Sequence, residues 1–157
     1  MFKKSNIRSV VSSDLAKLKT VLDDTDLFPS EFLEGMLNPF FNDPNSTDYW
    51  RTYEHNGQPV ALLFCEQERM TESTWNVLAI AVSPALQGNG IGELLMSDIE
   101  ETLKDNKQST LIVETSGLAE FERTRKFYDN IGFNREAVIR DFYAQGDDKV
   151  IFWKSLR

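Results

Sequence analysis

The stretch Leu78-Ala79-Ile80-Ala81-Val82-Ser83-Pro84-Ala85-Leu86-Gln87-Gly88-Asn89-Gly90-Ile91-Gly92 joins an apolar run to a glycine-rich turn and the start of a helix. The apolar residues from Trp75 to Val82 predict a buried central strand. Four apolar residues at helical spacing predict a helix from Gly90 to Leu103. Because glycine lets the backbone bend sharply and lets a ligand approach it closely, we expect an open turn between the two elements.

A turn of this kind is suited to bind phosphate, because the first N–H groups of a helix have no intrahelical partner and the helix dipole is positive there. Two common phosphate loops are excluded. A Walker loop needs Lys and then Ser or Thr after its last glycine, whereas Gly92 is followed by Glu93 and Leu94. The pattern G-x-G-x-x-G would need glycine at position 93. The remaining pattern is Gln87-x-x-Gly90-x-Gly92. The alternative to phosphate binding is that these glycines only let the turn between strand and helix pack tightly.

A second motif, Arg125-Lys126-Phe127-Tyr128-Asp129-Asn130-Ile131-Gly132-Phe133, predicts a helix that carries Phe-Tyr and ends at a glycine. Together the two motifs resemble the GNAT-type (GNAT superfamily) N-acetyltransferases, whose acetyl-CoA signature is Gln/Arg-x-x-Gly-x-Gly/Ala. The resemblance covers nearly the whole chain, because the order of the expected elements, β-α-α-β-β-β-α-β-α-β-β, also matches that family.

The expected fold class is mixed α/β, in one domain spanning residues 1–157. The resemblance implies a central, mostly antiparallel sheet with one splayed parallel strand pair and flanking helices. We expect Asn56-Gly57 to form a tight hairpin turn, because both residues tolerate positive φ. We also expect a helix from Pro29 with Phe32, Leu33, Met36 and Leu37 inward, a loop over Asn38 to Thr47, and a closing hairpin around Gly146-Asp147-Asp148.

The resemblance implies that acetyl-CoA is the co-substrate and that Tyr128 protonates the leaving thiolate. Many members of the family carry Asn seven positions before this tyrosine, and here that position is Phe121. The contact that this asparagine makes to acetyl-CoA is therefore either absent here or supplied by Ser116 or Arg125. The resemblance also implies that the end of the strand before the turn offers backbone groups to the pantetheine arm of acetyl-CoA, through Ile80, Ala81 and Val82. The turn would hold the pyrophosphate of acetyl-CoA through Gln87, Gly88, Asn89, Gly90, Ile91 and Gly92.

The general base is less well defined by the sequence. Glu114 lies at the end of the buried strand expected from Leu111 to Thr115 and is the first candidate, with a purely solvated carboxylate as the alternative. Glu66, on the neighbouring strand, is a weaker rival. Cys65 is interpreted as a buried apolar residue, because a covalent mechanism needs an activating histidine and the only one, His55, falls in a hairpin turn. One histidine and one cysteine assemble no metal site, so we expect no metal.

The net charge of the chain narrows the classes of acceptor. The chain has 17 Lys and Arg against 25 Asp and Glu, a net charge of -8, which argues against nucleic acid and anionic membrane as partners. We therefore expect an enzyme that acts on a primary amine of a small molecule or peptide, with an acidity that serves only solubility as the alternative interpretation of the charge. The acceptor site would be shaped by the two N-terminal helices, the loop from Asn38 to Thr47 and the Phe142-Tyr143 hairpin. Cys65 is the only cysteine and forms no intrachain disulfide, so we expect a cytoplasmic location. A homodimer is compatible with the sequence. The alternative function is a non-catalytic acyl-CoA-binding sensor or interaction module.

Overall fold

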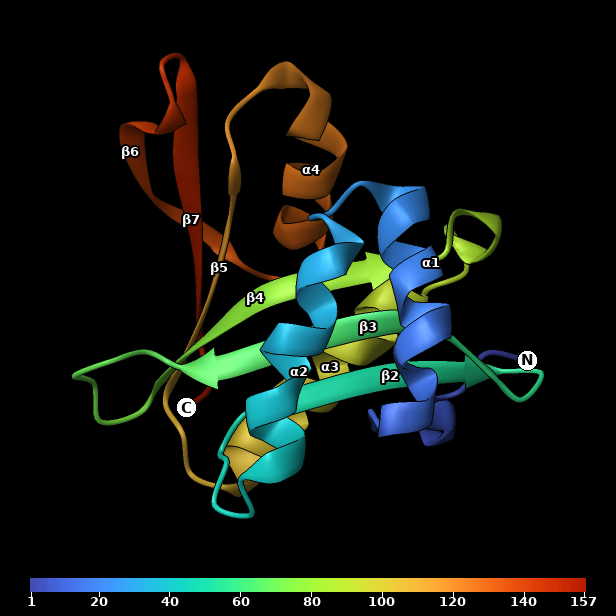
Figure 1. The fold of residues 1–157 in the computed structure, drawn as a ribbon. Helices are drawn as coiled ribbons and strands as arrows, with labels where there is room; N and C mark the ends of the chain where they lie inside the picture. Colours follow the sequence, from blue (N-terminus) through green and yellow to red (C-terminus); the bar gives the residue numbers. More distant parts are fainter. The chain divides into compact units, whose positions relative to one another are not determined.

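The predicted order of strands and helices recurs in the structure, a computed structural model that describes residues 1–157. Figure 1 shows the ribbon. The main elements are β1 (Ile7–Ser9), α1 (Leu15–Thr25), α2 (Leu33–Asn42), β2 (Tyr49–His55), β3 (Gln58–Gln67), β4 (Thr74–Val82), α3 (Ile91–Asp105), β5 (Thr110–Ser116), α4 (Glu122–Asn130), β6 (Asn134–Ala144) and β7 (Asp147–Ser155).

The sheet has seven strands in the order β1-β2-β3-β4-β5-β7-β6. Strands β4 and β5 are parallel, with a register that runs from Thr74 opposite Thr110 to Val77 opposite Val113. Antiparallel pairs join β1 to β2, β2 to β3, β5 to β7 and β6 to β7. The expected mixed, mostly antiparallel sheet with one parallel pair and flanking helices is confirmed.

The chain forms two compact units, each built from two separate segments. The first comprises residues 1–66 and 79–102, and so contains β1, α1, α2, β2, most of β3, the end of β4 and most of α3. The second comprises residues 67–78 and 103–157, with the start of β4, then β5, α4, β6 and β7.

In the first unit, the predicted hairpin between β2 and β3 is confirmed. Asn56 and Gly57 have φ angles of 52° and 75°, the left-handed values that a two-residue turn of this type requires. His55 pairs with Gln58 on either side of the turn. The local dipeptide therefore sets the register of the two strands.

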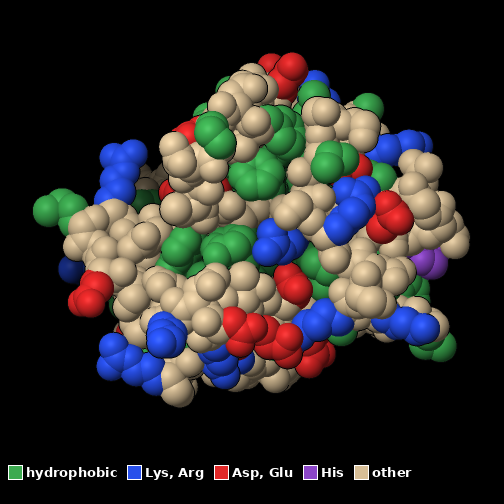
Figure 2. Space-filling model, turned by 90° about the horizontal axis from the view of Figure 1, so that it is seen from below, with side chains coloured by type: hydrophobic (Ala, Val, Ile, Leu, Met, Phe, Trp, Pro, Cys, Tyr) green, Lys and Arg blue, Asp and Glu red, His purple; other side chains and the backbone are tan.

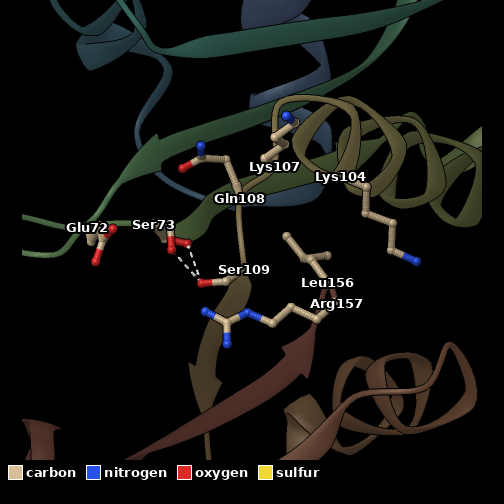
Figure 3. A pocket seen from close by; sticks show the side chains of 8 residues that line it. All are labelled: Glu72, Ser73, Lys104, Lys107, Gln108, Ser109, Leu156 and Arg157. Atoms are coloured by element: carbon tan, nitrogen blue, oxygen red, sulfur yellow. Dashed lines mark hydrogen bonds between the residues drawn. The ribbon is translucent and has the colours of Figure 1, made fainter.

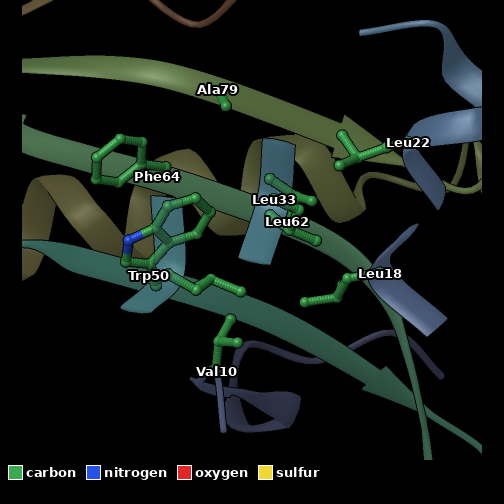
Figure 4. Close-up of a cluster of buried hydrophobic side chains, with 9 residues drawn as sticks. Val10, Leu18, Leu22, Leu33, Trp50, Leu62, Phe64 and Ala79 are labelled. Carbon is green, nitrogen blue, oxygen red and sulfur yellow. The ribbon is translucent and has the colours of Figure 1, made fainter. Parts of the chain in front are cut away.

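The hydrophobic core of the first unit lies between the sheet and helices α1 and α2. These helices lie on one face of β2 and β3, and α3 lies on the other (Figure 1). The indole of Trp50 stacks on the ring of Phe64, with centroids 4.1 Å apart, and each fully buried apolar side chain contributes about 1.5–3 kcal/mol. The buried cluster, part of which Figure 4 labels, consists of Val10, Leu18, Leu22, Leu33, Leu37, Trp50, Leu62, Phe64 and Ala79.

Helix α2 corrects two predictions. The loop expected from Asn38 is wrong at its start, because α2 continues through Pro39 to Asn42. Proline inside a helix costs about 3 kcal/mol, and the packing of Phe40 and Phe41 against the core offsets this cost. Phe32 was expected to point inward but is 57% exposed, since it closes a short 3-10 turn and lies outside the apolar stripe of α2.

In the second unit, strands β5 and β7 present two chemically different faces. Side chains alternate along a strand, so Glu114 and Lys149 share one face, and Val113 and Phe152 share the other. Helix α4 covers the second face, because the ring of Tyr128 packs against Phe152 with centroids 5.2 Å apart. The first face carries the ion pair of Glu114 and Lys149 beside the apolar Ile112 and Ile151.

The closing hairpin also differs from the prediction. Ala144 pairs with Asp147, so Gln145 and Gly146 form the turn, and Gly146 has a φ of 80°. Asp147 and Asp148 belong to β7 instead of the turn. The Asp148 carboxylate accepts a hydrogen bond from the N–H of Asp141 (3.0 Å), at an irregularity of β6, and this contact crosses the hairpin between β6 and β7.

None of the helices is both long and apolar enough to cross a membrane. On the face that Figure 2 shows, Lys and Arg side chains are interspersed with Asp and Glu side chains. This face therefore offers no continuous basic stripe of the kind that binds a nucleic-acid backbone.

Candidate active site

The glycine-rich turn before α3 lies on the surface of the first unit. Residues 87–90 are exposed, and α3 begins at Ile91. Gly88 and Gly90 have φ angles of 82° and 84°, and a Cβ added at either position meets no atom within 4 Å. Glycine is therefore required by backbone conformation and not by lack of space. The turn leaves room for an anion beside the first N–H groups of α3.

Side chains of the turn stabilise its shape. Gln87 Nε2 donates to the Val82 carbonyl (2.9 Å), and Asn89 Nδ2 donates to the Leu86 carbonyl (2.9 Å). Ile91 is 1% exposed and anchors the start of α3 in the core. Because these side-chain NH2 groups bond to the turn itself, the backbone N–H groups are the natural donors to a phosphate. The predicted contacts through residues 80–82 and 87–92 stay predictions.

Tyr128 is the predicted general acid, and α4 places it in the interior of the second unit. It is 3% exposed and contacts Phe133 and Phe152 at ring-centroid distances of 6.0 and 5.2 Å. Burial raises the pKa of Tyr128 above that of free tyrosine, because a phenolate would lose its hydration. The hydroxyl is consequently protonated at physiological pH, as a proton donor must be.

Arg125 and Ser116 tie α4 to the end of β5. Arg125 is 8% exposed, and its Nη1 donates to the carbonyls of Ser116 (2.7 Å) and Leu118 (2.8 Å). The Ser116 hydroxyl donates to Asp147 Oδ1 (2.5 Å) and accepts from the Leu118 N–H (3.1 Å). Both groups thus have structural partners, and their contact with acetyl-CoA stays a prediction.

Glu114, the predicted base, lies on the opposite face of the sheet from Tyr128. The parallel pairing of β5 with β4 ends at Val113, so Glu114 is the first residue of β5 beyond that pairing. Its Oε1 accepts a hydrogen bond from Asn76 Nδ2 (2.6 Å), and its Oε2 forms an ion pair with Lys149. The Glu114 side chain is only 18% exposed, so these partners hold the carboxylate in one orientation.

Two neighbours of Glu114 escaped the sequence analysis. Asn76 lies in the apolar run of β4 and is 1% exposed, and its Nδ2 also donates to Glu68 Oε1 (2.7 Å). A lone asparagine inside an apolar strand was the signal that could have found Asn76. Nothing local distinguished Glu68, which follows β3 and meets Asn76 only through the fold.

The aromatic pair on β6 lies beside the same charged groups. Lys149 Nζ lies 3.5 Å from the centroid of the Phe142 ring, a cation–π contact. Partial burial, and then the negative charges of Glu114 and Asp147, raise the pKa of Tyr143. The predicted Phe142-Tyr143 segment therefore contributes aromatic surface to the face that carries Glu114.

Cys65, Glu66 and His55 lie in the first unit. Cys65 is fully buried, and burial raises the pKa of its thiol, which confirms its interpretation as an inert core residue. His55 ends β2, and its ring stacks on Phe2 with centroids 5.2 Å apart. Glu66 is partly buried near the end of β3, and its weaker candidacy as base stays a prediction.

A polar pocket of about 500 Å³ lies in the second unit, at the start of β4 and β5 (Figure 3). The hydroxyls of Ser73 and Ser109 are 2.5 Å apart there. Lys104 lies at the C-terminal end of α3, where a cation complements the helix dipole. No predicted site residue lines this pocket, so we do not assign it to the reaction. Its lining residues are Glu72, Ser73, Lys104, Lys107, Gln108, Ser109, Leu156 and Arg157.

Residues 18–133 match the model of the acetyltransferase (GNAT) family, so the chain belongs to that family. The chain is 32% identical over 90 residues to [ribosomal protein bS18]-alanine N-acetyltransferase of Haemophilus influenzae, a match that spans 57% of this chain and 58% of that enzyme.

Solved structures show the same fold. A GNAT-family protein from Desulfovibrio desulfuricans superposes with a TM-score of 0.89 at 24% identity, over 96% of this chain and 98% of its own. An aminoglycoside 6′-N-acetyltransferase solved in complex with coenzyme A superposes with a TM-score of 0.76 at 15% identity, over 96% and 97% of the two chains. The family resemblance deduced from the two motifs is thereby confirmed.

Proposed function

We propose that the chain is an N-acetyltransferase that transfers the acetyl group of acetyl-CoA to a primary amine of a small molecule or peptide. The observation that carries the proposal is the open glycine turn at the start of α3, in a chain that belongs to the acetyltransferase family. Backbone N–H groups of residues 87–92 would hold the pyrophosphate. Each charge-assisted hydrogen bond contributes about 1.5–3 kcal/mol, so a few suffice.

The acceptor must lose a proton before it reacts. An alkyl amine has a pKa of about 10.4, so deprotonation near pH 7.4 costs roughly 4 kcal/mol. In the proposed reaction Glu114, directly or through a water molecule, removes this proton, and Asn76 and Lys149 orient the carboxylate. The base and its two partners come from three different strands of the second unit, which fixes their geometry.

The neutral amine then attacks the thioester carbonyl in a ternary complex, with a C–N bond forming as the C–S bond breaks. Tyr128 donates its phenolic proton to the departing thiolate, and its burial keeps that proton in place until then. The attacking nitrogen loses its second proton as the amide forms, and this proton returns through water to the phenolate, which restores the Tyr128 hydroxyl. The proposal involves no metal. Within the structure, no group of three or more His, Cys, Asp or Glu side chains is arranged to hold one.

The relatives named above act on an alanine of a ribosomal protein and on aminoglycosides, and both kinds of acceptor present an amine. The net charge of -8 suits a cationic acceptor better than a nucleic acid or an anionic membrane. A cytoplasmic location is part of the proposal, and a homodimer is compatible with it.

Release of free thiol from acetyl-CoA, measured with a panel of amines, amino acids and short peptides, tests this proposal. We expect turnover with at least one class of amine and none with hydroxyl acceptors. Tight acetyl-CoA binding without turnover for any amine would support the sensor function instead. Absence of acetyl-CoA binding would refute the assignment of the glycine turn as the pyrophosphate-binding site.

A further inference from the structure

A polar cluster in the second unit joins the segment after β3 to strands β4 and β5. The NH2 group of Asn76 donates to Glu68 Oε1 (2.7 Å) and to Glu114 Oε1 (2.6 Å). One amide nitrogen thus holds two carboxylates close together. Neighbouring carboxylates repel each other unless opposite charge compensates them, so the source of that compensation decides what the cluster does.

The compensation is incomplete. Glu114 pairs with Lys149, whereas none of the ion pairs of the chain includes Glu68. Glu68 is partly buried and so retains access to solvent on one side. Two carboxylates and one ammonium leave the cluster with one negative charge that no side chain neutralises.

The second observation is an unused acceptor in the middle of the cluster. Asn76 is 1% exposed, and its Oδ1 has no hydrogen-bond donor. This oxygen belongs to the same amide group whose nitrogen bridges Glu68 and Glu114. A buried carbonyl without a donor is costly and rare in native proteins, so it calls for a missing partner. A cationic donor would give the Asn76 oxygen its hydrogen bond and would neutralise the charge of Glu68, which has no ion pair.

We propose that Glu68 and Asn76 form a cation subsite that binds an ammonium group of the acceptor other than the one that is acetylated. This inference rests on the proposed acetyltransferase function. The attacking amine must be neutral, whereas an ammonium held by Glu68 Oε and Asn76 Oδ1 is stabilised in its charged form. The two roles therefore need two amino groups. The acceptors that fit are aliphatic diamines and polyamines, and Glu68 and Asn76 determine specificity for them.

The test compares 1,4-diaminobutane with butylamine, which has the same carbon chain and only one amino group. We expect the unmodified protein to show a higher kcat/KM for the diamine, by about tenfold or more, as one charge-assisted hydrogen bond supplies. Glu68→Gln should abolish this ratio, mainly through the KM for the diamine. Glu72→Gln removes the same charge from an exposed position of the same connecting segment and should preserve the ratio.

A purely structural role for Glu68 would give a different result. It would lower the melting temperature and the kcat/KM of both amines by the same factor, and that outcome would overturn the subsite. Calorimetric binding of 1,4-diaminobutane provides a readout that does not depend on turnover. Binding that Glu68→Gln weakens by about tenfold supports the subsite even if no acetylation is detected, whereas no binding to the unmodified protein refutes it.

Discussion

Replacing Gly90 by aspartate tests whether the turn before α3 binds the pyrophosphate of acetyl-CoA. Gly90 has a φ of 84°, a conformation that costs an L-residue about 1–2 kcal/mol. A Cβ at this position meets no atom within 4 Å, so steric overlap adds nothing to that cost. For a chain of this size, the strain alone should lower the melting temperature by about 2–8 °C.

The added carboxylate should weaken the binding of acetyl-CoA. A carboxylate about 4 Å from a phosphate charge is repelled by roughly 1 kcal/mol in water and roughly 4 kcal/mol at an effective dielectric constant of 20. The affinity for acetyl-CoA should consequently fall by about fivefold to a thousandfold. Gly90→Ala, which carries the strain without the charge, should lose much less.

Thermal unfolding with and without acetyl-CoA measures the effect. At a concentration 100-fold above its Kd, acetyl-CoA should stabilise the unmodified protein by about 2.7 kcal/mol, or about 5–11 °C. At the same acetyl-CoA concentration the stabilisation should fall in Gly90→Asp to about 1.8 kcal/mol for a fivefold loss of affinity and to almost nothing for a thousandfold loss. It should persist in Gly57→Asp, a matched control with a φ of 75° and open space in the β2–β3 turn. Undiminished acetyl-CoA affinity of Gly90→Asp in calorimetry would refute the assigned pyrophosphate site.

Three further substitutions test the proposed general acid, the proposed general base and an ion pair that stabilises the fold. Tyr128→Phe should leave folding and acetyl-CoA affinity intact and lower kcat by about a hundredfold, and an unchanged kcat across a pH series would leave Tyr128 a packing residue. Glu114→Gln should lower kcat/KM most at low pH, where few amine molecules are neutral, and a uniform or absent effect would contradict the role as base. Asp14 accepts hydrogen bonds from Arg8 (2.8 and 2.9 Å) and from the Val11 N–H (2.9 Å), and the bonds to Arg8 lower its pKa. A pKa that is lower in the folded state gives stability that is present above about pH 4 and lost as the pH falls further. Asp14→Asn should therefore lower the free energy of unfolding by about 2 kcal/mol at pH 7 and by less at pH 3, and urea denaturation showing equal losses at both pH values would contradict this.

The sequence by itself determined the elements whose signals are local. Asn56-Gly57 defined a hairpin because few other dipeptides adopt two successive left-handed conformations at low cost. The apolar run of β4, the glycine turn and the stripe of α3 defined the strand–turn–helix unit, since alternation, helical periodicity and positive φ are encoded within a few residues. The family followed from such motifs. The roles of Tyr128, taken from the resemblance, and of Glu114, taken from its place at the end of a strand, stay predictions.

Tertiary structure alone decided the features that depend on residues far apart in the chain. Helix α2 passes through Pro39 because Phe40 and Phe41 pack onto a core that other elements supply. The base candidate Glu114 gained its environment in the same way, from Asn76 on β4 and Lys149 on β7. Side-chain contacts across a sheet depend on which strands pair and in which register. That pairing is a property of the whole folded chain, because distant segments gain by burying their apolar surfaces together.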